Sequence, residues 1–208
     1  MEITIIGTGN MGRGIATRML AAGHRVTLLG TNADNARRLA EELSGDVEPG
    51  TVGDPLAGDA VVLAVWYPDP VHDVLNRYGD QLDGKVVVDI TNPIDPDAFE
   101  PLTVEAGSVA QEVASTVSGA KVVKAFNTTF AATLEEGEVD GEALDVLLAS
   151  DDDGAKQTVA ELVEGSGLRP VDAGPLKRAH ELEALGYLHM ALQQPLGKNF
   201  STALKVIG

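Results

Sequence analysis

The sequence predicts an α/β protein built on a doubly wound, mostly parallel sheet of the Rossmann type. The first observation is the run Ile3–Ile6, which predicts a buried strand and is followed directly by the glycine pattern G-x-G-x-x-G over residues 7–12. The second is the alternation of apolar strands and amphipathic helices along the chain. The third is the length of 208 residues, which suits one large domain or one and a half small ones.

The segment Gly7-Thr8-Gly9-Asn10-Met11-Gly12 has the order that a dinucleotide-binding turn requires. Gly7 permits the tight turn, Gly9 lets the backbone approach a pyrophosphate, and Gly12 lets the following helix pack close to the strand. The N-terminus of that helix offers free N–H groups and a partial positive charge to the phosphates. The alternative is an ordinary glycine-rich turn between strand and helix that binds nothing.

The next elements follow from periodicity. Residues 11–22 carry apolar side chains at helical spacing, and Gly23 is typical of the position just past a helix C-terminus. Arg25–Leu29 is predicted to be the second strand. The helix after it has its apolar face at Ala36, Leu39, Ala40 and Leu43.

The junction after the second strand indicates which dinucleotide is bound. Proteins that select NAD usually place an Asp or Glu at the end of this strand, where it bonds the ribose 2′-OH. Here the position is Gly30, and Thr31 and Asn32 are small hydrogen-bonding residues that suit a 2′-phosphate. The pair Arg37-Arg38 is expected to reach that phosphate from the next helix. The sequence therefore favours NADP over NAD, while Asp34 as a ribose ligand and Thr31 or Asn32 as a simple helix cap stay open.

The third strand is predicted at 59–65, a continuous apolar run typical of an interior parallel strand. It ends at Trp66 and Tyr67, and strand C-termini line the ligand crevice of a doubly wound sheet. Both rings are therefore candidates to cover the cofactor, with packing against a loop as the alternative for Tyr67. Asp54-Pro55 before this strand is typical of a very short helical turn, and 68–78 is predicted to be helical.

Four further segments complete the first portion of the chain. Lys85–Ile90 is predicted to be a strand that leads into Asn92-Pro93, and the proline-containing stretch 94–103 is predicted to be a loop. Ser108 is expected to cap a helix that runs to about 118, and Lys121–Phe126 is the next predicted strand. With right-handed crossovers, this alternation predicts an open parallel sheet.

The shorter second portion holds two more strands. These are predicted at Ala143–Ala149 and Leu168–Asp172. The triplet Asp151–Asp153 is expected to begin a helix, where acidic residues suit the helix dipole, with a metal site as the alternative. We predict a Rossmann domain over 1–150 and a small C-terminal extension over 151–208 that completes the sheet and the acceptor site within one compact unit.

The last predicted helix carries leucines at helical spacing, with interruption expected at Pro195 and Gly197. They are Leu182, Leu185, Leu188, Leu192 and Leu196. Such a stripe either packs on the protein's own sheet or is shared between two subunits, and both alternatives stay open. A homodimer through this helix is the hypothesis that follows from the second.

Composition excludes several classes of partner. The chain has 32 Asp and Glu against 15 Lys and Arg, and its formal net charge of -17 argues against nucleic acid and anionic membranes. No cysteine is present to form a disulfide, a thiol nucleophile or a metal ligand. Because no signal peptide precedes the first strand and no apolar run approaches a membrane span, we expect a cytoplasmic protein. The acidic surplus indicates either an ordinary surface or adaptation to high salt.

The titratable residues form no recognisable catalytic set. Each of the four histidines falls in a predicted helix or at a helix end, away from most strand C-termini; they are His24, His72, His180 and His189. Structural roles are therefore expected for them, with His180 nearest to the predicted crevice because it follows the Gly174-Pro175 turn. No Ser–His–Asp or Lys–Tyr arrangement is apparent, so no catalytic acid or base is predicted.

Four segments in this order resemble a known family. They are Gly7–Gly12, Asn92-Pro93, V-V-K-A-F-N-T at 122–128 and L-R-P-V-D-A-G-P-L at 168–176. Together they resemble the reductases that exchange hydride between NADP and the deazaflavin coenzyme F420, and also the cytosolic oxidoreductase domain of STEAP-type metalloreductases. The resemblance extends over nearly the whole chain, and the last two segments are much more specific than the glycine pattern.

The resemblance implies roles for several of these segments. Residues 8–11 hold the pyrophosphate, and 31–32 lie where the family binds the 2′-phosphate. The loop after Val65 and Asn92-Pro93 flank the nicotinamide, and 126–129 borders the second cofactor. With the residues chosen from the glycine pattern and the second strand, the predicted cofactor-binding set is Gly7, Thr8, Gly9, Asn10, Met11, Gly12, Thr31, Asn32, Arg37, Val65, Trp66, Asn92, Pro93, Phe126, Asn127 and Thr128.

The predicted function is hydride transfer between NADP(H) and a flat, flavin-like acceptor such as coenzyme F420. Stacking two rings needs proximity and orientation more than titratable groups, and the strand ends at Trp66, Asn92 and Asn127 offer aromatic and amide side chains. One alternative is an NADPH-dependent reductase of a small imine or carbonyl, which needs a larger substrate domain or a dimer. The other is a non-catalytic dinucleotide sensor.

Overall fold

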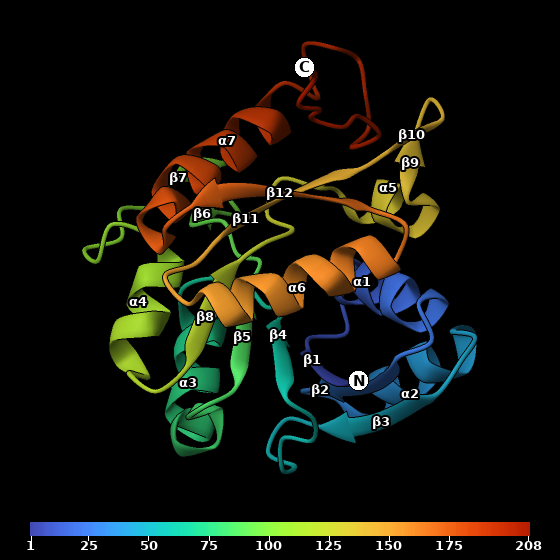
Figure 1. Cartoon of the computed structure of the whole chain (residues 1–208), viewed down its shortest axis with the longest axis vertical. Coiled ribbons are helices and arrows are strands. Elements are labelled where there is room, and N and C mark those ends of the chain that lie inside the picture. Colours follow the sequence, from blue (N-terminus) through green and yellow to red (C-terminus); the bar gives the residue numbers. More distant parts are fainter.

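A computed structural model describes all residues, 1–208, and its centre is one eight-stranded sheet of order β12-β11-β8-β5-β4-β1-β2-β3 (Figure 1). Its strands are β1 (Glu2–Ile6), β2 (Arg25–Gly30), β3 (Val47–Thr51), β4 (Ala60–Leu63), β5 (Val86–Asp89), β8 (Lys121–Lys124), β11 (Asp145–Ala149) and β12 (Arg169–Gly174). The strands from β8 to β3 are all parallel, β11 joins β8 in the antiparallel sense, and β12 is parallel to β11. The Rossmann-type, mostly parallel sheet is confirmed.

Helices cover both faces of this sheet. They are α1 (Asn10–Ala21), α2 (Ala33–Glu42), α3 (Asp69–Leu82), α4 (Val109–Thr116), α5 (Ala131–Glu136), α6 (Asp153–Gly165) and α7 (Ala179–Ala191), with a 3-10 turn η1 (Leu176–Arg178) before the last. Side chains of α1, α2 and α6 share one buried cluster, and those of α3 and α4 share the other. Adjacent residues of β5 point to opposite faces of the sheet, as expected for a strand: Val88 belongs to the cluster with α1, α2 and α6, and Val87 to the cluster with α3 and α4.

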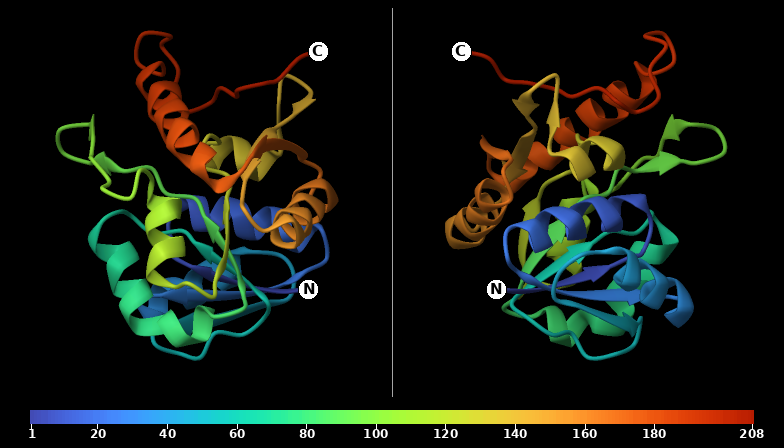
Figure 2. Two further views of the ribbon diagram at one scale, coloured as in Figure 1. Left: turned by 60° about the vertical axis from the view of Figure 1, so that its left-hand side comes forward. Right: turned by 90° about the vertical axis from the view of Figure 1, so that its right-hand side faces the viewer.

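The C-terminal helix α7 does not lie on a sheet face. It crosses the end of the sheet at which β5 and β8 finish (Figures 1 and 2), and the amide of Asn127, just after β8, donates to the carbonyl of Leu182 in α7. A hairpin of β6 (Ile94–Asp95) and β7 (Glu100–Pro101) projects beside it. This placement brings the C-terminal residues to the carboxyl ends of the parallel strands, where doubly wound folds bind ligands.

Several local expectations are wrong. No helical turn forms at Asp54-Pro55, where the Asp54 carboxylate instead accepts from Thr51 N–H at the end of the unexpected strand β3. The stretch 94–103 holds the β6–β7 hairpin instead of being only a loop. Helix α5 and a small hairpin of β9 (Glu138–Val139) and β10 (Glu142–Ala143) were also not anticipated. In each case the segment is short, so its contacts with the rest of the protein decide its structure.

The leucine stripe of the last helix is divided between the interior and the surface. Leu182 is buried, whereas Leu188 and Leu196 are more than half exposed. Helix α7 ends at Ala191, four residues before the interruption that was expected at Pro195. No helix is long and apolar enough to cross a membrane.

Candidate functional site

The glycine turn has the shape of a phosphate cradle. Gly7 has φ +123°, and a Cβ there would lie 2.0 Å from the carbonyl oxygen of Ala64. A Cβ on Gly12 would lie 2.1 Å from the carbonyl oxygen of Gly7, so only glycine allows α1 to approach the turn this closely. A Cβ on Gly9 would meet nothing within 4 Å, which leaves room above the backbone for a ligand.

The start of α1 is left without a capping group from the protein. Gly9 is the N-cap, so no side chain accepts a hydrogen bond from the first amides, and the first turn contains no acidic residue. Asn10 is exposed and Met11 is half-buried. Free N–H groups together with the positive end of the helix dipole favour an anion at this position.

Thr8 links the glycine turn to the end of β2. A Cβ on Gly30 would lie 3.1 Å from Thr8 Cγ2 and 3.1 Å from the carbonyl oxygen of Asn32, so a larger residue at 30 would be crowded. The absence of an acidic residue at this position thus has a packing reason as well as the predicted cofactor reason. The neighbouring Thr31 and Asn32 are both exposed.

Asn32 caps the helix, as the alternative anticipated. Its Oδ1 accepts from the N–H groups of Asp34 at 2.8 Å and Asn35 at 3.2 Å. Arg37 is exposed and its Nη1 pairs with Asp34 Oδ1 at 2.9 Å. Arg37 is therefore tied through Asp34 to the end of the helix that Asn32 caps.

The aromatic residues after β4 have different surroundings. Trp66 is 67% exposed at the end of the sheet, and Val65 before it is half-buried. Tyr67 donates to Glu112 Oε2 at 3.0 Å, and His72 Nε2 lies 2.5 Å from the other oxygen of Glu112. Burial and the nearby carboxylate raise the pKa of Tyr67 to about 12. The Tyr67 ring is therefore held by Glu112 of α4 and His72 of α3, whereas Trp66 is exposed and free to contact a ligand.

Two asparagines meet between the ends of β5 and β8. Asn92 Nδ2 donates to the carbonyl of Asn127 at 2.8 Å, and Asn127 Nδ2 donates to Asn92 Oδ1 at 3.0 Å and to the carbonyl of Leu182 at 2.7 Å. Because backbone carbonyls accept from both amides, the orientation of each amide is fixed. Asn127 Oδ1 is then a buried acceptor that receives no donor from the protein.

Helix α7 covers this pair closely. A Cβ on Gly186 would lie 2.7 Å from Asn92 Oδ1 and 2.8 Å from the carbonyl oxygen of Asn127, so a larger residue would lift the helix. Phe126 and Thr128 are buried beside Asn127, and the carbonyl of Thr128 accepts from His189 Nδ1 at 3.1 Å. Their side chains contribute packing here, and their predicted contact with a second cofactor stays a prediction.

A buried ionic cluster lies directly beneath the asparagines and was not predicted. Lys124 Nζ donates to Asp89 Oδ2 at 2.8 Å, to the Thr91 carbonyl at 2.5 Å and to Glu183 Oε1 at 2.7 Å. Lys124 and Asp89 are fully buried and Glu183 nearly so. All three ammonium hydrogens are used, which holds the end of β5 against β8 and α7.

The chain is 34% identical over 202 residues to the F420-dependent NADP reductase of Methanothermobacter thermautotrophicus, and the match covers 89% of this chain and 86% of that protein. It belongs to the F420-dependent NADP reductase family. A family model described as NADP oxidoreductase, coenzyme F420-dependent, matches residues 2–93. The metalloreductase STEAP3 of Rattus norvegicus is 31% identical over 185 residues, which is 88% of this chain but only 36% of that protein's length.

Solved structures agree with this family assignment. The structure of a candidate F420-dependent NADP-reductase from Arthrobacter sp. FB24 superposes with a TM-score of 0.86 and 26% identity over 99% of both chains. The imine reductase of Bacillus cereus has a TM-score of 0.64 and 20% identity, covering 94% of this chain and 60% of that one. That second likeness shows a shared fold and nothing more.

In this member of the F420-dependent NADP reductase family, three of the four histidines are held by contacts within the protein. His24 contacts the N-terminal amine, His72 contacts Glu112, and His189 is buried against Phe130. His180 is exposed in α7 and its Nδ1 donates to the Gly107 carbonyl at 2.8 Å. It lines a cavity beside the site, which makes it the one histidine able to meet a ligand there.

Proposed function

We propose that the protein is an NADP(H)-dependent oxidoreductase that transfers hydride between nicotinamide and a flat, flavin-like acceptor such as coenzyme F420. The observation that carries this proposal is the glycine cradle, in which Gly7 and Gly12 exclude any side chain while Gly9 stays open. The names of the full-length relatives, F420-dependent NADP reductases, support the choice of both ligands.

The residues present fit NADP(H). The amides of 8–11 would hold the pyrophosphate at the start of α1, and Thr31, Asn32 and Arg37 would contact the 2′-phosphate. Trp66 and Asn92-Pro93 would border the nicotinamide from either side. The buried, donor-less Asn127 Oδ1 suits an N–H such as that of the carboxamide.

The chain's own part in the reaction is binding and orientation. When bound, NADPH supplies the hydride, and the strand ends hold the two rings in contact. Helix α7 helps to hold the paired amides of Asn92 and Asn127 in fixed orientations, which stiffens the surface against which the rings would stack. No side chain is assigned as an essential acid or base, and the proton that accompanies the hydride comes from solvent.

One observation supports a second candidate function, the reduction of a small imine or carbonyl. His180 and Glu183 both line the cavity next to Pro93, so titratable groups are available for reduction of a small imine or carbonyl. NADPH oxidation followed by absorbance with F420, FMN, FAD and a panel of cyclic imines distinguishes the functions. We expect turnover with F420 or a flavin; turnover with imines alone would contradict the proposal, and tight NADPH binding without turnover of any acceptor would indicate a sensor.

The quaternary and domain arrangements belong to the same proposal. Leu188, Leu192 and Leu196 leave an apolar surface on and just after α7, and we propose that a second copy of the chain covers it. We also propose that 151–208 acts as the extension that completes the acceptor site, since α7 supplies groups to the strand ends.

A further inference from the structure

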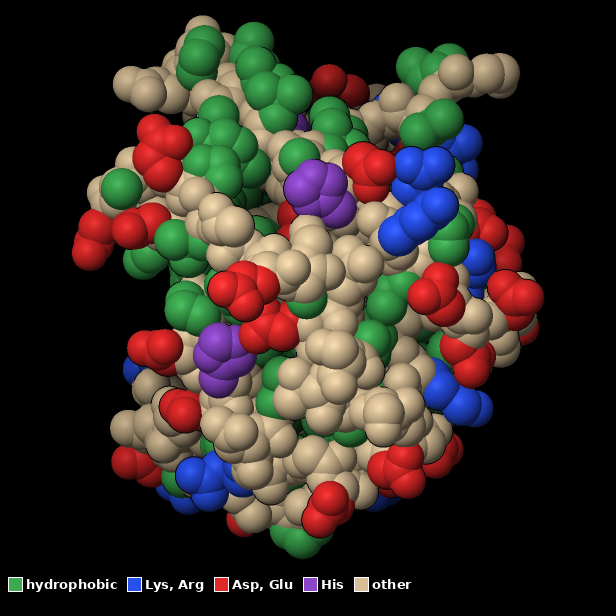
Figure 3. Space-filling view, turned by 90° about the vertical axis from the view of Figure 1, so that its left-hand side faces the viewer, with side chains coloured by type: hydrophobic (Ala, Val, Ile, Leu, Met, Phe, Trp, Pro, Cys, Tyr) green, Lys and Arg blue, Asp and Glu red, His purple; other side chains and the backbone are tan.

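A cavity opens between α7 and the segment 93–107, beside the strand ends. Its volume is about 310 Å³ and its walls are mostly apolar, with Ile94, Leu102, Ala184 and Tyr187 among them. Figure 3 views this face of the molecule, where apolar side chains gather over α7 and the neighbouring loops. Pro93 lines the cavity and directly follows Asn92, so the cavity adjoins the proposed nicotinamide position. Its size and lining suit a planar organic ring.

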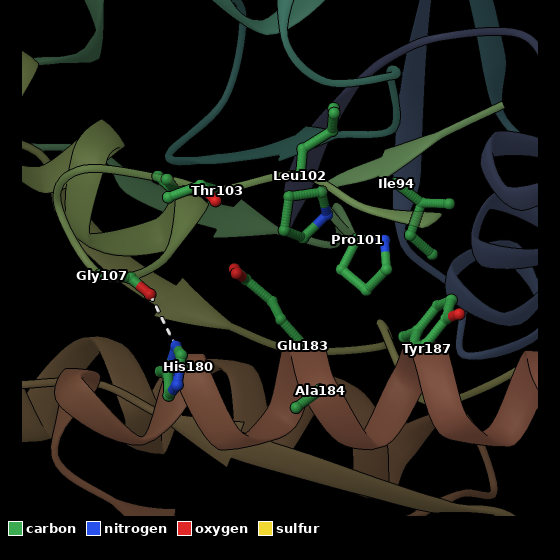
Figure 4. Close-up of a pocket in the computed structure, with 11 residues that line it drawn as sticks. Ile94, Pro101, Leu102, Thr103, Gly107, His180, Glu183, Ala184 and Tyr187 are labelled. Atoms are coloured by element: carbon green, nitrogen blue, oxygen red, sulfur yellow. Dashed lines mark hydrogen bonds between the residues drawn. The ribbon is translucent and has the colours of Figure 1, made fainter. Parts of the chain in front are cut away.

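Glu183 is the charged acceptor of this cavity. Figure 4 shows its side chain reaching from α7 into the space between the two walls. Its Oε1 accepts from Lys124 Nζ at 2.7 Å and from the Val109 N–H at 3.0 Å, whereas Oε2 receives only the Val109 N–H, at 3.3 Å. Each carboxylate oxygen can accept two hydrogen bonds, so Oε2 has capacity for a further donor.

Two other side chains that line the cavity already make hydrogen bonds with backbone carbonyls. His180 Nδ1 donates to the Gly107 carbonyl at 2.8 Å, shown as the dashed line in Figure 4, and the Tyr187 hydroxyl donates to the Phe99 carbonyl at 3.4 Å. Behind Glu183 the cluster holds one cation, Lys124, against two carboxylates, so a ligand meets net negative charge when both are ionised. This arrangement favours an apolar ligand with an N–H and opposes an anionic one.

We infer that Glu183 selects the hydride acceptor, by accepting a hydrogen bond at Oε2 from an N–H on a flat, apolar ring such as the ring imide of a deazaflavin. The inference rests on the proposed function and deepens it, because it names the group that recognises the acceptor. A buried polar group that is built to pair with an N–H rejects analogues that lack it. An N-methyl analogue should therefore bind about 10- to 100-fold more weakly.

The test compares 5-deazariboflavin with its N3-methyl derivative, each titrated by fluorescence in the presence of saturating NADP. Wild-type protein should bind the N–H form about 10- to 100-fold more tightly. Glu183→Leu should lose this preference, and Glu183→Gln, which keeps an oxygen acceptor, should retain part of it. Glu181→Leu is the matched control on the exposed part of the same helix and should behave as wild type.

The outcomes separate the two proposals. Equal affinity of wild-type protein for the two rings would overturn the role of Glu183 while leaving the flavin-like acceptor in place. Failure of both rings to bind would overturn the flavin-like acceptor itself, and with it the role of Glu183. Because the decisive comparison uses wild-type protein, it does not depend on the folding of either Glu183 variant.

Discussion

Replacing Lys124 by Met is expected to destabilise the protein strongly. Lys124 is fully buried and gives all three ammonium hydrogens to Asp89, Thr91 and Glu183. Methionine retains most of the aliphatic stem, so the substitution removes the charge with little change in packing. Two carboxylates then remain buried at the end of the sheet without their cation.

Removing one partner of a buried ion pair lowers the free energy of unfolding by about 3–5 kcal/mol. For a domain of this size each kcal/mol corresponds to roughly 2–4 °C, so the melting temperature should fall by roughly 6–20 °C. Burial already raises the pKa of Glu183 and Lys124 opposes that rise, so the variant's Glu183 pKa should be higher still. A carboxyl whose pKa is higher in the folded than in the unfolded protein stabilises the folded state when it is protonated. This stabilisation is complete below the pKa of the unfolded state, about 4.3, and is lost as the pH rises through the pKa of the folded state.

The fall in melting temperature caused by Lys124→Met should therefore be larger at pH 7.5 than at pH 5.5. Thermal unfolding followed by circular dichroism at both pH values measures it. Lys121→Met is the matched control, because Lys121 lies on the same strand, is exposed and takes part in no ion pair; it should shift the melting temperature by only a degree or two. The reasoning would be refuted if both variants shifted the melting temperature equally, or if the loss in Lys124→Met were larger at pH 5.5 than at pH 7.5.

Four other outcomes are expected. Arg37→Ala should weaken NADPH binding about 10-fold or more in a fluorescence titration and leave NADH binding unchanged, with Arg25→Ala as the exposed control; equal losses for both dinucleotides would count against a 2′-phosphate contact. Stability should rise between low and molar KCl, because the screening length falls from about 10 Å at 0.1 M to about 3 Å at 1 M, and an unchanged melting temperature would remove the high-salt hypothesis. Light scattering should show a dimer that Leu188→Glu dissociates, whereas a concentration-independent wild-type monomer would contradict the interface. Asn127→Ala should slow hydride transfer with nearly unchanged NADPH affinity, while His180→Ala keeps most of the activity between about pH 6 and 8; a bell-shaped pH profile lost in His180→Ala would reveal an acid or base.

The sequence predicted the cradle because its determinants are local. Gly7, Gly9 and Gly12 lie within six residues: close contacts with Ala64 and with the turn itself require Gly7 and Gly12, and Gly9 leaves open space above the backbone. Strand β3 was missed because Val47–Thr51 contains Glu, Pro and Gly and lacks an apolar pattern. It forms at the sheet edge, where only β2 pairs with it, so few of its side chains need to be buried.

The features that refine the site depend on residues far apart in the chain. Lys124 and Glu183 are separated by 59 positions and Asn92 and Asn127 by 35, so no local pattern announces either pair. The signal that the sequence does carry is a charged residue at the end of a buried strand, seen at Asp89 and again at Lys124. Neighbouring parallel strands bring such residues together, since β5 and β8 pair with Asp89 opposite Lys124.

One turn of α7 supplies three of the contacts that shape this end of the sheet. The Leu182 carbonyl fixes the amide of Asn127, the Glu183 carboxylate completes the shell of Lys124, and Gly186 allows the helix to touch Asn92. A Rossmann sheet alone leaves its strand ends in water, where amides rotate freely and exchange partners. Docking of α7 removes that freedom before any ligand arrives, and it leaves two fixed groups with spare hydrogen-bonding capacity, Asn127 Oδ1 and Glu183 Oε2. Both are acceptors, which is why we expect the ligands of this site to be recognised through their N–H groups.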